Sequence, residues 1–177
     1  NTLEFLVMSG MELPLAVMIT IPEPWANNDT ISQAKRDFYQ YYATMMEPWD
    51  GPASILFSDG DVMGAVLDRN GLRPSRYYIT SDGYMILSSE VGVLPIPEEK
   101  IVLKERLHPG KMLLVDTVKG KVIDDNELKE GYAKMQPYGE WLDSHLVQLK
   151  DIKIPNERPE EYTPEQRARL QKAFGYT

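Results

Sequence analysis

The segment from Leu67 to Tyr77 gathers more side chains capable of chemistry than any other stretch of the chain. It contains the acidic residue Asp68 and three arginines, Arg69, Arg73 and Arg76. A guanidinium group binds a carboxylate through two parallel hydrogen bonds, so these arginines could hold a carboxylate ligand. The alternative is ion pairing within the protein, for which the nearby acids are Asp68, Asp82 and Glu90. Ion-pair networks are common away from active sites, and we favour this structural role.

The backbone of the same segment is set by two residues. Gly71 can adopt a positive φ, whereas Pro74 fixes its own φ and biases Arg73 towards extended geometry. The pattern therefore predicts a tight corner between two strands.

The run Asp-Arg-Asn-Gly-Leu-Arg-Pro over residues 68–74, followed by Ser-Arg-Tyr-Tyr, resembles the Asp-x-x-Gly-x-Arg-Pro signature of class II glutamine amidotransferases. In this spelling it is similar to the large subunits of glutamate synthases. Residues 46–53, 88–94 and 107–112 resemble the same subunits in the same order, and the resemblance covers residues 1 to about 125. The residues that carry the family signature, to which we assign a structural role, are Asp68, Asn70, Gly71, Arg73, Pro74, Ser89 and Glu90.

The resemblance implies a nucleophile that this sequence lacks. Members of the family act through an N-terminal cysteine whose own α-amine is the general base, but this chain begins Asn1-Thr2 and contains no cysteine. An amide side chain cannot replace a thiolate, and Thr2 is better explained as a helix cap. We therefore expect the second half of a glutaminase domain of glutamate synthase, without its catalytic first half and inactive alone. The alternative is a non-catalytic interaction or scaffold module with the same fold.

Two other catalytic interpretations have little support. The family builds its oxyanion hole from an Asn-Gly pair in an earlier segment, whereas Asn70-Gly71 lies inside the Arg-Pro signature and is typical of a turn. A serine hydrolase site made from Ser75 or Ser89 with His108 lacks a Gly-x-Ser-x-Gly nucleophile elbow.

Composition limits the function classes. A chain of 177 residues with 42% hydrophobic content can bury one core, and its net charge of −8 disfavours nucleic-acid binding. The longest apolar stretch, residues 13–21, is too short to span a bilayer, so we expect no membrane partner and a cytoplasmic location. The absence of cysteine excludes disulfides and thiolate metal sites, and two isolated histidines, His108 and His145, predict no metal site.

Helices are expected before the strands. Residues 2–9 should form a short helix ended by Gly10, followed by a very apolar helix to about Thr20, and both should be buried. A capping box of Thr30 and Gln33 predicts a helix to about Glu47. Its core stripe would contain Ala34, Phe38, Tyr41 or Tyr42, and Met45, and its polar face would contain Lys35, Arg36 and Gln40.

Strand periodicity begins at Pro52. Turns at Asp59-Gly60, Asp82-Gly83 and Lys119-Gly120 between apolar runs predict three hairpins in one antiparallel sheet over residues 53–124, covered on both faces. The fold class is therefore α+β, and the resemblance implies half of an αββα N-terminal-nucleophile hydrolase sandwich. The face towards the missing sheet should be apolar, which could drive self-association.

The C-terminal part is more polar. A charged, proline-rich linker is expected between Asp151 and Tyr162, and Thr163-Pro164 with Gln166 predicts a helix to Phe174. We assign residues 1–150 to the C-terminal half of the amidotransferase domain and residues 151–177 to a linker and helix leading to a following domain. By resemblance, the partners are the missing first half and the downstream synthase domains. FMN and an iron–sulfur cluster would belong to those later domains, and we expect no cofactor in this chain.

Overall fold

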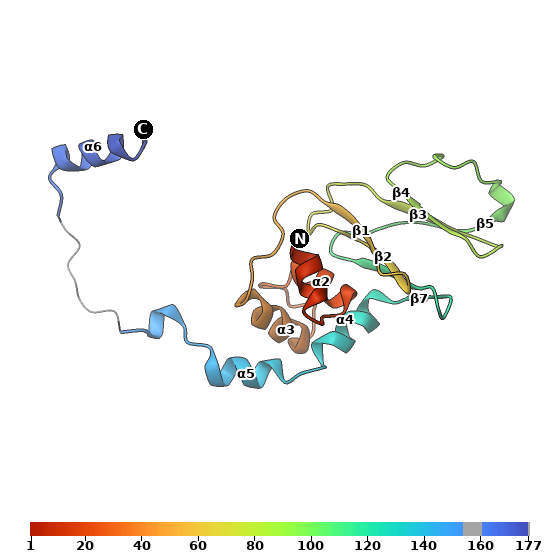
Figure 1. The fold of residues 1–177 in the computed structure, drawn as a ribbon, viewed down its shortest axis with the longest axis horizontal. Helices are drawn as coiled ribbons and strands as arrows, with labels where there is room; N and C mark the ends of the chain where they lie inside the picture. The colour runs from red at the N-terminus through yellow and green to blue at the C-terminus, as the bar shows by residue number, and fades with distance from the viewer. Residues whose placement is uncertain (154–160, 177) are drawn as a thin grey trace. The chain divides into compact units, whose positions relative to one another are not determined.

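A computed structural model of the protein describes residues 1–153 and 161–176. The chain forms two compact units, Asn1–His145 and Leu146–Thr177. The first unit combines helices with two antiparallel sheets, which confirms the expected mixed α+β class (Figure 1).

The described helices are α1 (Thr2–Met8), α2 (Leu13–Thr20), α3 (Gln33–Ala43), α4 (Asp125–Ala133), α5 (Tyr138–His145), α6 (Pro164–Ala173) and the 3-10 turns η1 (Glu98–Lys100) and η2 (Leu149–Asp151). The described strands are β1 (Ser54–Ser58), β2 (Val62–Leu67), β3 (Arg76–Thr80), β4 (Met85–Ser88), β5 (Ile101–Arg106), β6 (Met112–Asp116) and β7 (Lys121–Ile123).

The first two helices form where the sequence predicts them, but they are buried to different extents. Every residue of α2 from Pro14 to Thr20 is buried, because this helix is apolar on all sides. None of the residues of α1 is buried, so the expectation that both helices lie in the core is wrong for α1. Leu3 and Leu6 of α1 are partly buried and pack against the helical core, whereas Phe5 and Met8 are exposed.

Helix α3 begins later than expected and by a different cap. The Oγ atom of Ser32 accepts the backbone N–H of Lys35 at 3.2 Å, which makes Ser32 the N-cap. The predicted Thr30–Gln33 capping box is wrong, since the Thr30 hydroxyl donates to the side chain of Asn28 at 2.6 Å. The helix also ends at Ala43 rather than near residue 47.

Aromatic packing holds α3 against α5. Phe38 is completely buried, and its ring meets that of Tyr138 edge to face with centroids 5.4 Å apart. Tyr41 packs on Trp141 with centroids 5.3 Å apart. The predicted role of the α3 stripe as core is confirmed for Phe38 and is wrong for Met45, which lies beyond the end of the helix and is 59% exposed.

The three predicted hairpins form, but they do not make one sheet. Strands β1, β2, β6 and β7 form a four-stranded sheet, and β4, β3 and β5 form a separate three-stranded sheet. The single-sheet prediction is therefore wrong. Strand β6 pairs with β2, far away in sequence, and β5 pairs with β3. Because β5 ends in the charged residues Lys104, Glu105 and Arg106, its sequence does not follow an apolar strand pattern.

The two faces of the four-stranded sheet pack into two different hydrophobic clusters. Val66 and Met112 are opposite each other and pack with the helices, which Figure 1 shows together beside β1 and β2. Ala65 and Leu113 are opposite each other on the other face and pack with residues of the three-stranded sheet such as Leu87. This alternation follows from the two-residue period of a strand.

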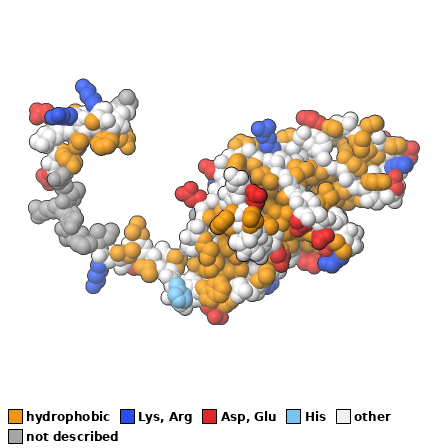
Figure 2. Space-filling view, viewed as in Figure 1, with side chains coloured by type: hydrophobic (Ala, Val, Ile, Leu, Met, Phe, Trp, Pro, Cys, Tyr) orange, Lys and Arg blue, Asp and Glu red, His pale blue; other side chains and the backbone are white. Residues whose placement is uncertain are grey.

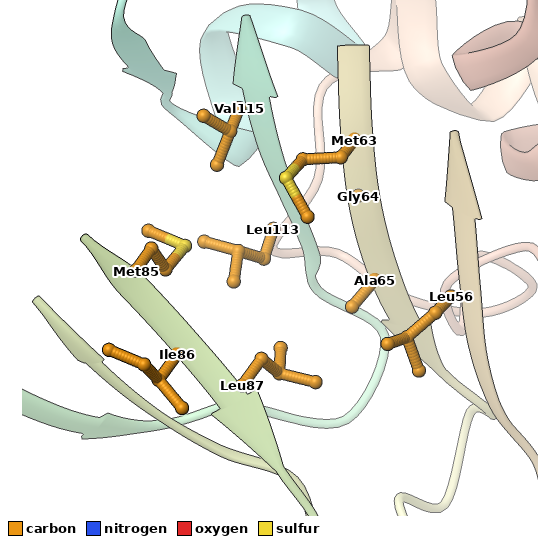
Figure 3. Close-up of a pocket in the computed structure, with 9 residues that line it drawn as sticks. All are labelled: Leu56, Met63, Gly64, Ala65, Met85, Ile86, Leu87, Leu113 and Val115. Atoms are coloured by element: carbon orange, nitrogen blue, oxygen red, sulfur yellow. The ribbon is translucent and has the colours of Figure 1, made fainter. Parts of the chain in front are cut away.

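The second face is not fully covered. Between the sheets lies an apolar groove of about 300 Å³, toward which the side chains in Figure 3 converge. The residues that line this groove are Leu56, Met63, Gly64, Ala65, Met85, Ile86, Leu87, Leu113 and Val115. Leu56 is 61% exposed, so the expectation of a sheet covered on both faces is wrong there. Figure 2 shows further hydrophobic side chains at the surface of the β3–β5 region.

The second unit contains η2 and α6. Thr163 and Gln166 form the predicted capping box, with the Thr163 hydroxyl accepting the Gln166 N–H at 3.2 Å. The helix ends at Ala173 with Phe174 as its C-cap. Most of the expected linker, residues 154–160, lies outside the described residues. Within the described ranges no helix has the length and apolar character needed to cross a bilayer.

Candidate functional site: the signature corner and its buried ionic support

The signature corner, residues 68–75, is organised by the carboxylate of Asp68. This residue follows the end of β2 and is 5% exposed. Its Oδ1 atom accepts the backbone N–H of Ala53 at 3.0 Å, and its Oδ2 atom accepts the N–H groups of Asn70 at 3.0 Å and Gly71 at 3.1 Å. One side chain therefore joins the start of β1 to the turn that follows β2.

These donors favour the ionised form of Asp68. Burial alone raises the pKa of a carboxyl group, but the backbone N–H groups of Ala53, Asn70 and Gly71 together lower it more. The pKa of Asp68 therefore lies below its usual value. The three backbone N–H groups thus hold Asp68 in its ionised form, and the carboxylate connects the segments that carry them.

Gly71 adopts the geometry that the sequence predicts. Its φ is 62°, and a Cβ atom at this position would overlap the ring of Pro109. Pro109 precedes Gly110, whose φ of 66° places a second tight turn against the first. The corner and the 108–111 turn thus fit together because the ring of Pro109 lies against the backbone of Gly71.

The arginines of the corner do not use the expected acidic partners. Arg69 pairs with Asp50, with Nη2 3.3 Å from Oδ1, rather than with Asp68. Asp82 instead pairs with Lys100 at 3.2 Å. Among the described residues, no ion pair joins Arg73 or Arg76 to a carboxylate. The predicted pairing is therefore wrong in its partners, because the carboxylate of Asp68 is already held by backbone donors.

The side chains of Ser89, Glu90 and Asn70 take no part in the hydrogen bonds that Asp68 accepts. Ser89 and Glu90 are exposed in the turn after β4, where the backbone N–H of Glu90 donates to the Oγ atom of Ser88 at 3.3 Å. Asn70 is exposed, and its backbone N–H is the group that bonds to Asp68. The structural role that we assign to all seven signature residues stays a prediction.

The serine and histidine residues do not assemble a hydrolase site. Ser75 is buried, and its Oγ atom lies 2.8 Å from the Oγ atom of Ser54. His108 lies 3.6 Å from Glu105 and bonds to no serine within the part of the chain that the structure describes. These contacts connect strands and turns.

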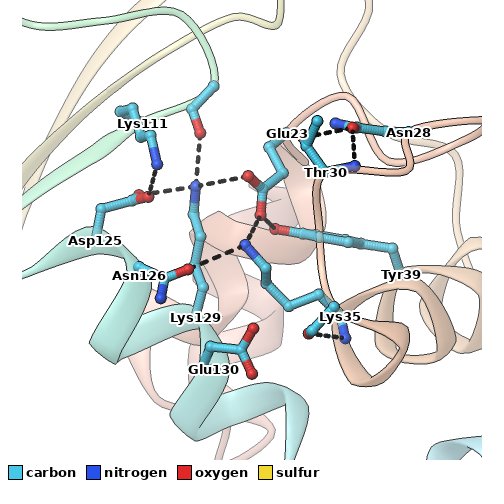
Figure 4. Close-up of polar contacts among 12 residues, drawn as sticks. Glu23, Asn28, Thr30, Lys35, Tyr39, Lys111, Asp125, Asn126, Lys129 and Glu130 are labelled. Atoms are coloured by element: carbon cyan, nitrogen blue, oxygen red, sulfur yellow. Dashed lines mark hydrogen bonds and ion pairs between the residues drawn. The ribbon is translucent and has the colours of Figure 1, made fainter.

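A buried ionic network lies behind the corner, and the sequence analysis missed it (Figure 4). We define it as Glu23, Lys35, Asp125 and Lys129. Lys35 is 3% exposed and Lys129 is 2% exposed, values that are rare for lysine unless its charge is paired. Lys35 was expected on the polar face of its helix, and that expectation is wrong.

Each charge of the network is compensated. The Nζ atom of Lys35 lies 3.2 Å from Oε1 of Glu23, which also accepts the Tyr39 hydroxyl at 3.1 Å. The Nζ atom of Lys129 lies 2.8 Å from Oδ1 of Asp125 and 3.7 Å from Oε2 of Glu23. Among the described side chains, no buried nitrogen or oxygen atom lacks a hydrogen-bond partner.

The network perturbs the groups that it contacts. Burial raises the pKa of the Tyr39 hydroxyl well above its usual value, and the negative charge of Glu23 adds to this shift. Burial by itself would raise the pKa of Asp125. The positive charge of Lys129 and the backbone N–H of Met112 lower this pKa by more, so the net shift is downward. Tyr39 therefore stays protonated while Asp125 stays ionised.

The network also reaches the 108–111 turn, which packs against the signature corner. Lys129 donates to the carbonyl oxygen of Gly110 at 2.6 Å, and Asp125 accepts from Lys111 at 2.9 Å and from the N–H of Met112 at 2.8 Å. These bonds fix the turn whose Pro109 lies against Gly71. A sequence signal existed in the four-residue spacing of Asp125 and Lys129, which places both on one side of a helix.

The residues of this chain do not fit the iron–sulfur cluster that the resemblance implies for its parent protein. An iron–sulfur cluster is held by cysteine thiolates, and the sequence has none. Within the described ranges, no group of three or more His, Asp or Glu side chains could hold a metal ion. No chemical step is therefore assigned to a metal or cofactor in this chain.

Comparison with known proteins gives the same family as the signature sequence of residues 68–74. Residues 1–141 match the family described as Glutamine amidotransferases class-II. The chain is 50% identical over 177 residues to the glutamate synthase [NADPH] large chain of Bacillus subtilis. It is 52% identical over 153 residues to the glutamate synthase [NADH] of Schizosaccharomyces pombe, and 44% identical over 180 residues to the chloroplastic ferredoxin-dependent glutamate synthase of Oryza sativa.

These alignments cover most or all of this chain but only a small share of each relative. They include 100%, 86% and 100% of the chain, against 11%, 7% and 11% of the respective relatives. The sequence is thus similar to one portion of much longer proteins. With its family match over residues 1–141, the chain belongs to the class II glutamine amidotransferases.

Proposed function

We propose that this chain is the C-terminal half of the glutaminase domain of a glutamate synthase. In this proposal residues 1–150 complete the amidotransferase domain, and residues 151–177 lead to a following synthase domain. The catalytic cysteine comes from another segment of the same polypeptide. Identity of 44% to 52% with glutamate synthases of three kinds supports this assignment.

The observation that carries the proposal is the apolar groove on the four-stranded sheet. Leu56 is 61% exposed and Met63 is 48% exposed, on the face opposite the helices. An exposed apolar sheet face is a typical surface for further packing. In this proposal the helices and this sheet form two of the four layers of an αββα sandwich, and the second pair of layers packs on the part of the sheet face that the three-stranded sheet leaves exposed.

In the proposed reaction, the catalytic cysteine lies in another segment of the polypeptide, and the residues of this chain hold the domain in shape. The cysteine thiolate attacks the side-chain amide carbon of glutamine, ammonia leaves, and water hydrolyses the resulting thioester to glutamate. The ammonia then reacts with 2-oxoglutarate elsewhere in the parent protein. The residues of this chain hold the sheet, fix the signature corner through Asp68 and exclude water from the sandwich core.

An assay of two proteins tests the proposal. The purified 177-residue chain should release no ammonia from glutamine above the buffer rate, because it lacks a thiol. The parent polypeptide should release ammonia and should be inactivated by a cysteine-directed glutamine analogue. Turnover by the 177-residue chain, or a parent unaffected by the analogue, would contradict the proposal.

A second candidate is a non-catalytic interaction or scaffold module of the same fold, because a fold alone does not establish a function. The coding sequence upstream of Asn1 distinguishes the two candidate functions. A cysteine codon directly after an initiator Met supports the glutaminase, whereas a parent protein without such a cysteine supports the module.

A further inference from the structure

A second cleft, of about 370 Å³, lies beside the signature corner, and its charges have one sign. Arg73, Arg76 and Arg106 line it, and none of its lining residues is an aspartate or a glutamate. The chain as a whole has 27 acidic residues and a net charge of −8. A cleft whose charged residues are all arginines contrasts with the acidic composition of the whole chain.

Strand pairing forces two of these arginines together. Arg76 of β3 lies directly opposite Arg106 of β5 in the antiparallel ladder. Residues in such positions share one face of the sheet, with Cβ atoms about 4.5–5.5 Å apart, and like charges placed there are destabilising. An anion between the two guanidinium groups would remove that repulsion.

The carboxylate of Glu105, next to Arg106 in the chain, does not provide this anion. Glu105 is opposite Tyr77, so its side chain starts on the other face of the sheet from Arg76 and Arg106. Its Oε1 atom lies 3.6 Å from Nε2 of His108 and accepts the backbone N–H of Arg106 at 2.9 Å. Within the described ranges, no ion pair reaches the guanidinium group of Arg76 or Arg106.

We propose that the cleft of Arg73, Arg76 and Arg106 binds a small dicarboxylate. One carboxylate lies between Arg76 and Arg106, whose planar guanidinium groups match its two oxygens, and the second carboxylate pairs with Arg73. The volume of about 370 Å³ is within the range of small-molecule sites. This site rests on the arginines and their register, and it does not depend on the glutaminase proposal.

Calorimetric titration of the 177-residue chain with succinate tests the site. At low ionic strength, where screening is weak, succinate should bind at least about tenfold more tightly than acetate or inorganic phosphate. Succinate should also raise the thermal unfolding temperature, because a ligand that binds the folded state stabilises it. No binding at about 10 mM succinate would overturn the proposal. Acetate or phosphate binding as tight as succinate would overturn the assignment to a dicarboxylate.

Matched variants separate this cleft from general charge attraction. Arg76→Gln and Arg106→Gln should each lower succinate affinity at least about tenfold, since one fork of the carboxylate clamp is lost. Arg69→Gln removes an exposed arginine that pairs with Asp50 and does not line the cleft, so it should leave affinity unchanged. Equal weakening in Arg69→Gln would overturn the proposal.

Folding of the variants is checked without ligand. Removing one of two opposed charges should leave the unfolding temperature at or above that of the unsubstituted chain. If Arg106→Gln does not fold, Arg106→Lys decides, because lysine keeps the charge but loses the planar fork. Succinate affinity should fall severalfold in Arg106→Lys, and unchanged affinity would show that the fork geometry is not used.

Discussion

The Oδ1 atom of Asp68 accepts the backbone N–H of Ala53 at 3.0 Å, which closes the open end of the β1–β2 hairpin. The same carboxylate bonds to the N–H groups of Asn70 and Gly71. Asp68→Asn keeps the size of the side chain but removes its charge and one acceptor. We expect the free energy of unfolding to fall by about 1–3 kcal/mol at pH 7, measured by urea denaturation. Asp61→Asn, at an exposed turn position, should change it by less than about 0.5 kcal/mol.

The lowered pKa of Asp68 also predicts a dependence on pH. A group whose pKa is depressed in the folded state contributes stability above its unfolded pKa of about 3.9, and this contribution is lost as pH falls through the folded pKa. The stability difference between the unsubstituted chain and Asp68→Asn should therefore shrink as pH is lowered below about 4. Denaturation at a series of pH values measures this difference, and a constant difference would contradict the role of the charge.

Gly71→Ala tests the fit between the corner and the 108–111 turn. The position has a φ of 62°, and a Cβ atom there would overlap Pro109. We expect a loss of about 1 kcal/mol or more in the free energy of unfolding. Gly131→Ala is the matched control, because Gly131 lies in helix α4 and a Cβ atom there would meet open space. Alanine at this position should raise the free energy of unfolding by up to about 1 kcal/mol. Equal effects of the two substitutions would contradict the prediction.

Lys129→Met tests the buried ionic network. The substitution keeps an apolar chain but removes the cation that pairs with Asp125 and the donor to the carbonyl of Gly110. Removing one partner of a buried pair costs about 3–5 kcal/mol, and we expect a loss of that size in chemical denaturation. Lys134→Met removes an exposed lysine that pairs with Glu130 one turn earlier, and it should cost less than about 1 kcal/mol. A small effect of Lys129→Met would mean that the network stabilises the fold little.

Local features of the fold were predictable from sequence, because their causes are local. Gly71 needs a positive φ, the Thr163 cap bonds three residues ahead, and the Asp-Gly turns connect neighbouring strands. Each depends on residues within a few positions. The hairpins and α6 therefore form as predicted.

Features that depend on distant partners were not predictable in this way. The pairing of β2 with β6 is set by packing across a long sequence separation, so hairpins in a row could not show that they divide into two sheets. Lys35 has a polar side chain in a position typical of a solvated face, and its burial depends on Glu23, which precedes the helix. At the signature corner, the sequence indicated that Asp68 and Gly71 are important residues. Only the structure showed that they contact Ala53 and Pro109.

The apolar groove predicts association of the isolated chain. Leu56 and Met63 expose 61% and 48% of their surface on one face of the sheet, and burial of such area is favourable at about 25 cal/mol per Å². We expect the 177-residue chain to self-associate as concentration rises, as measured by sedimentation velocity. A double variant, Leu56→Lys with Met63→Lys, should shift the chain towards monomer, because a charge on this face must lose its hydration when the surfaces meet. Val118→Lys adds a charge at a position that is 74% exposed and outside the groove, so equal suppression by this control would show that net charge, and not the groove, sets the association.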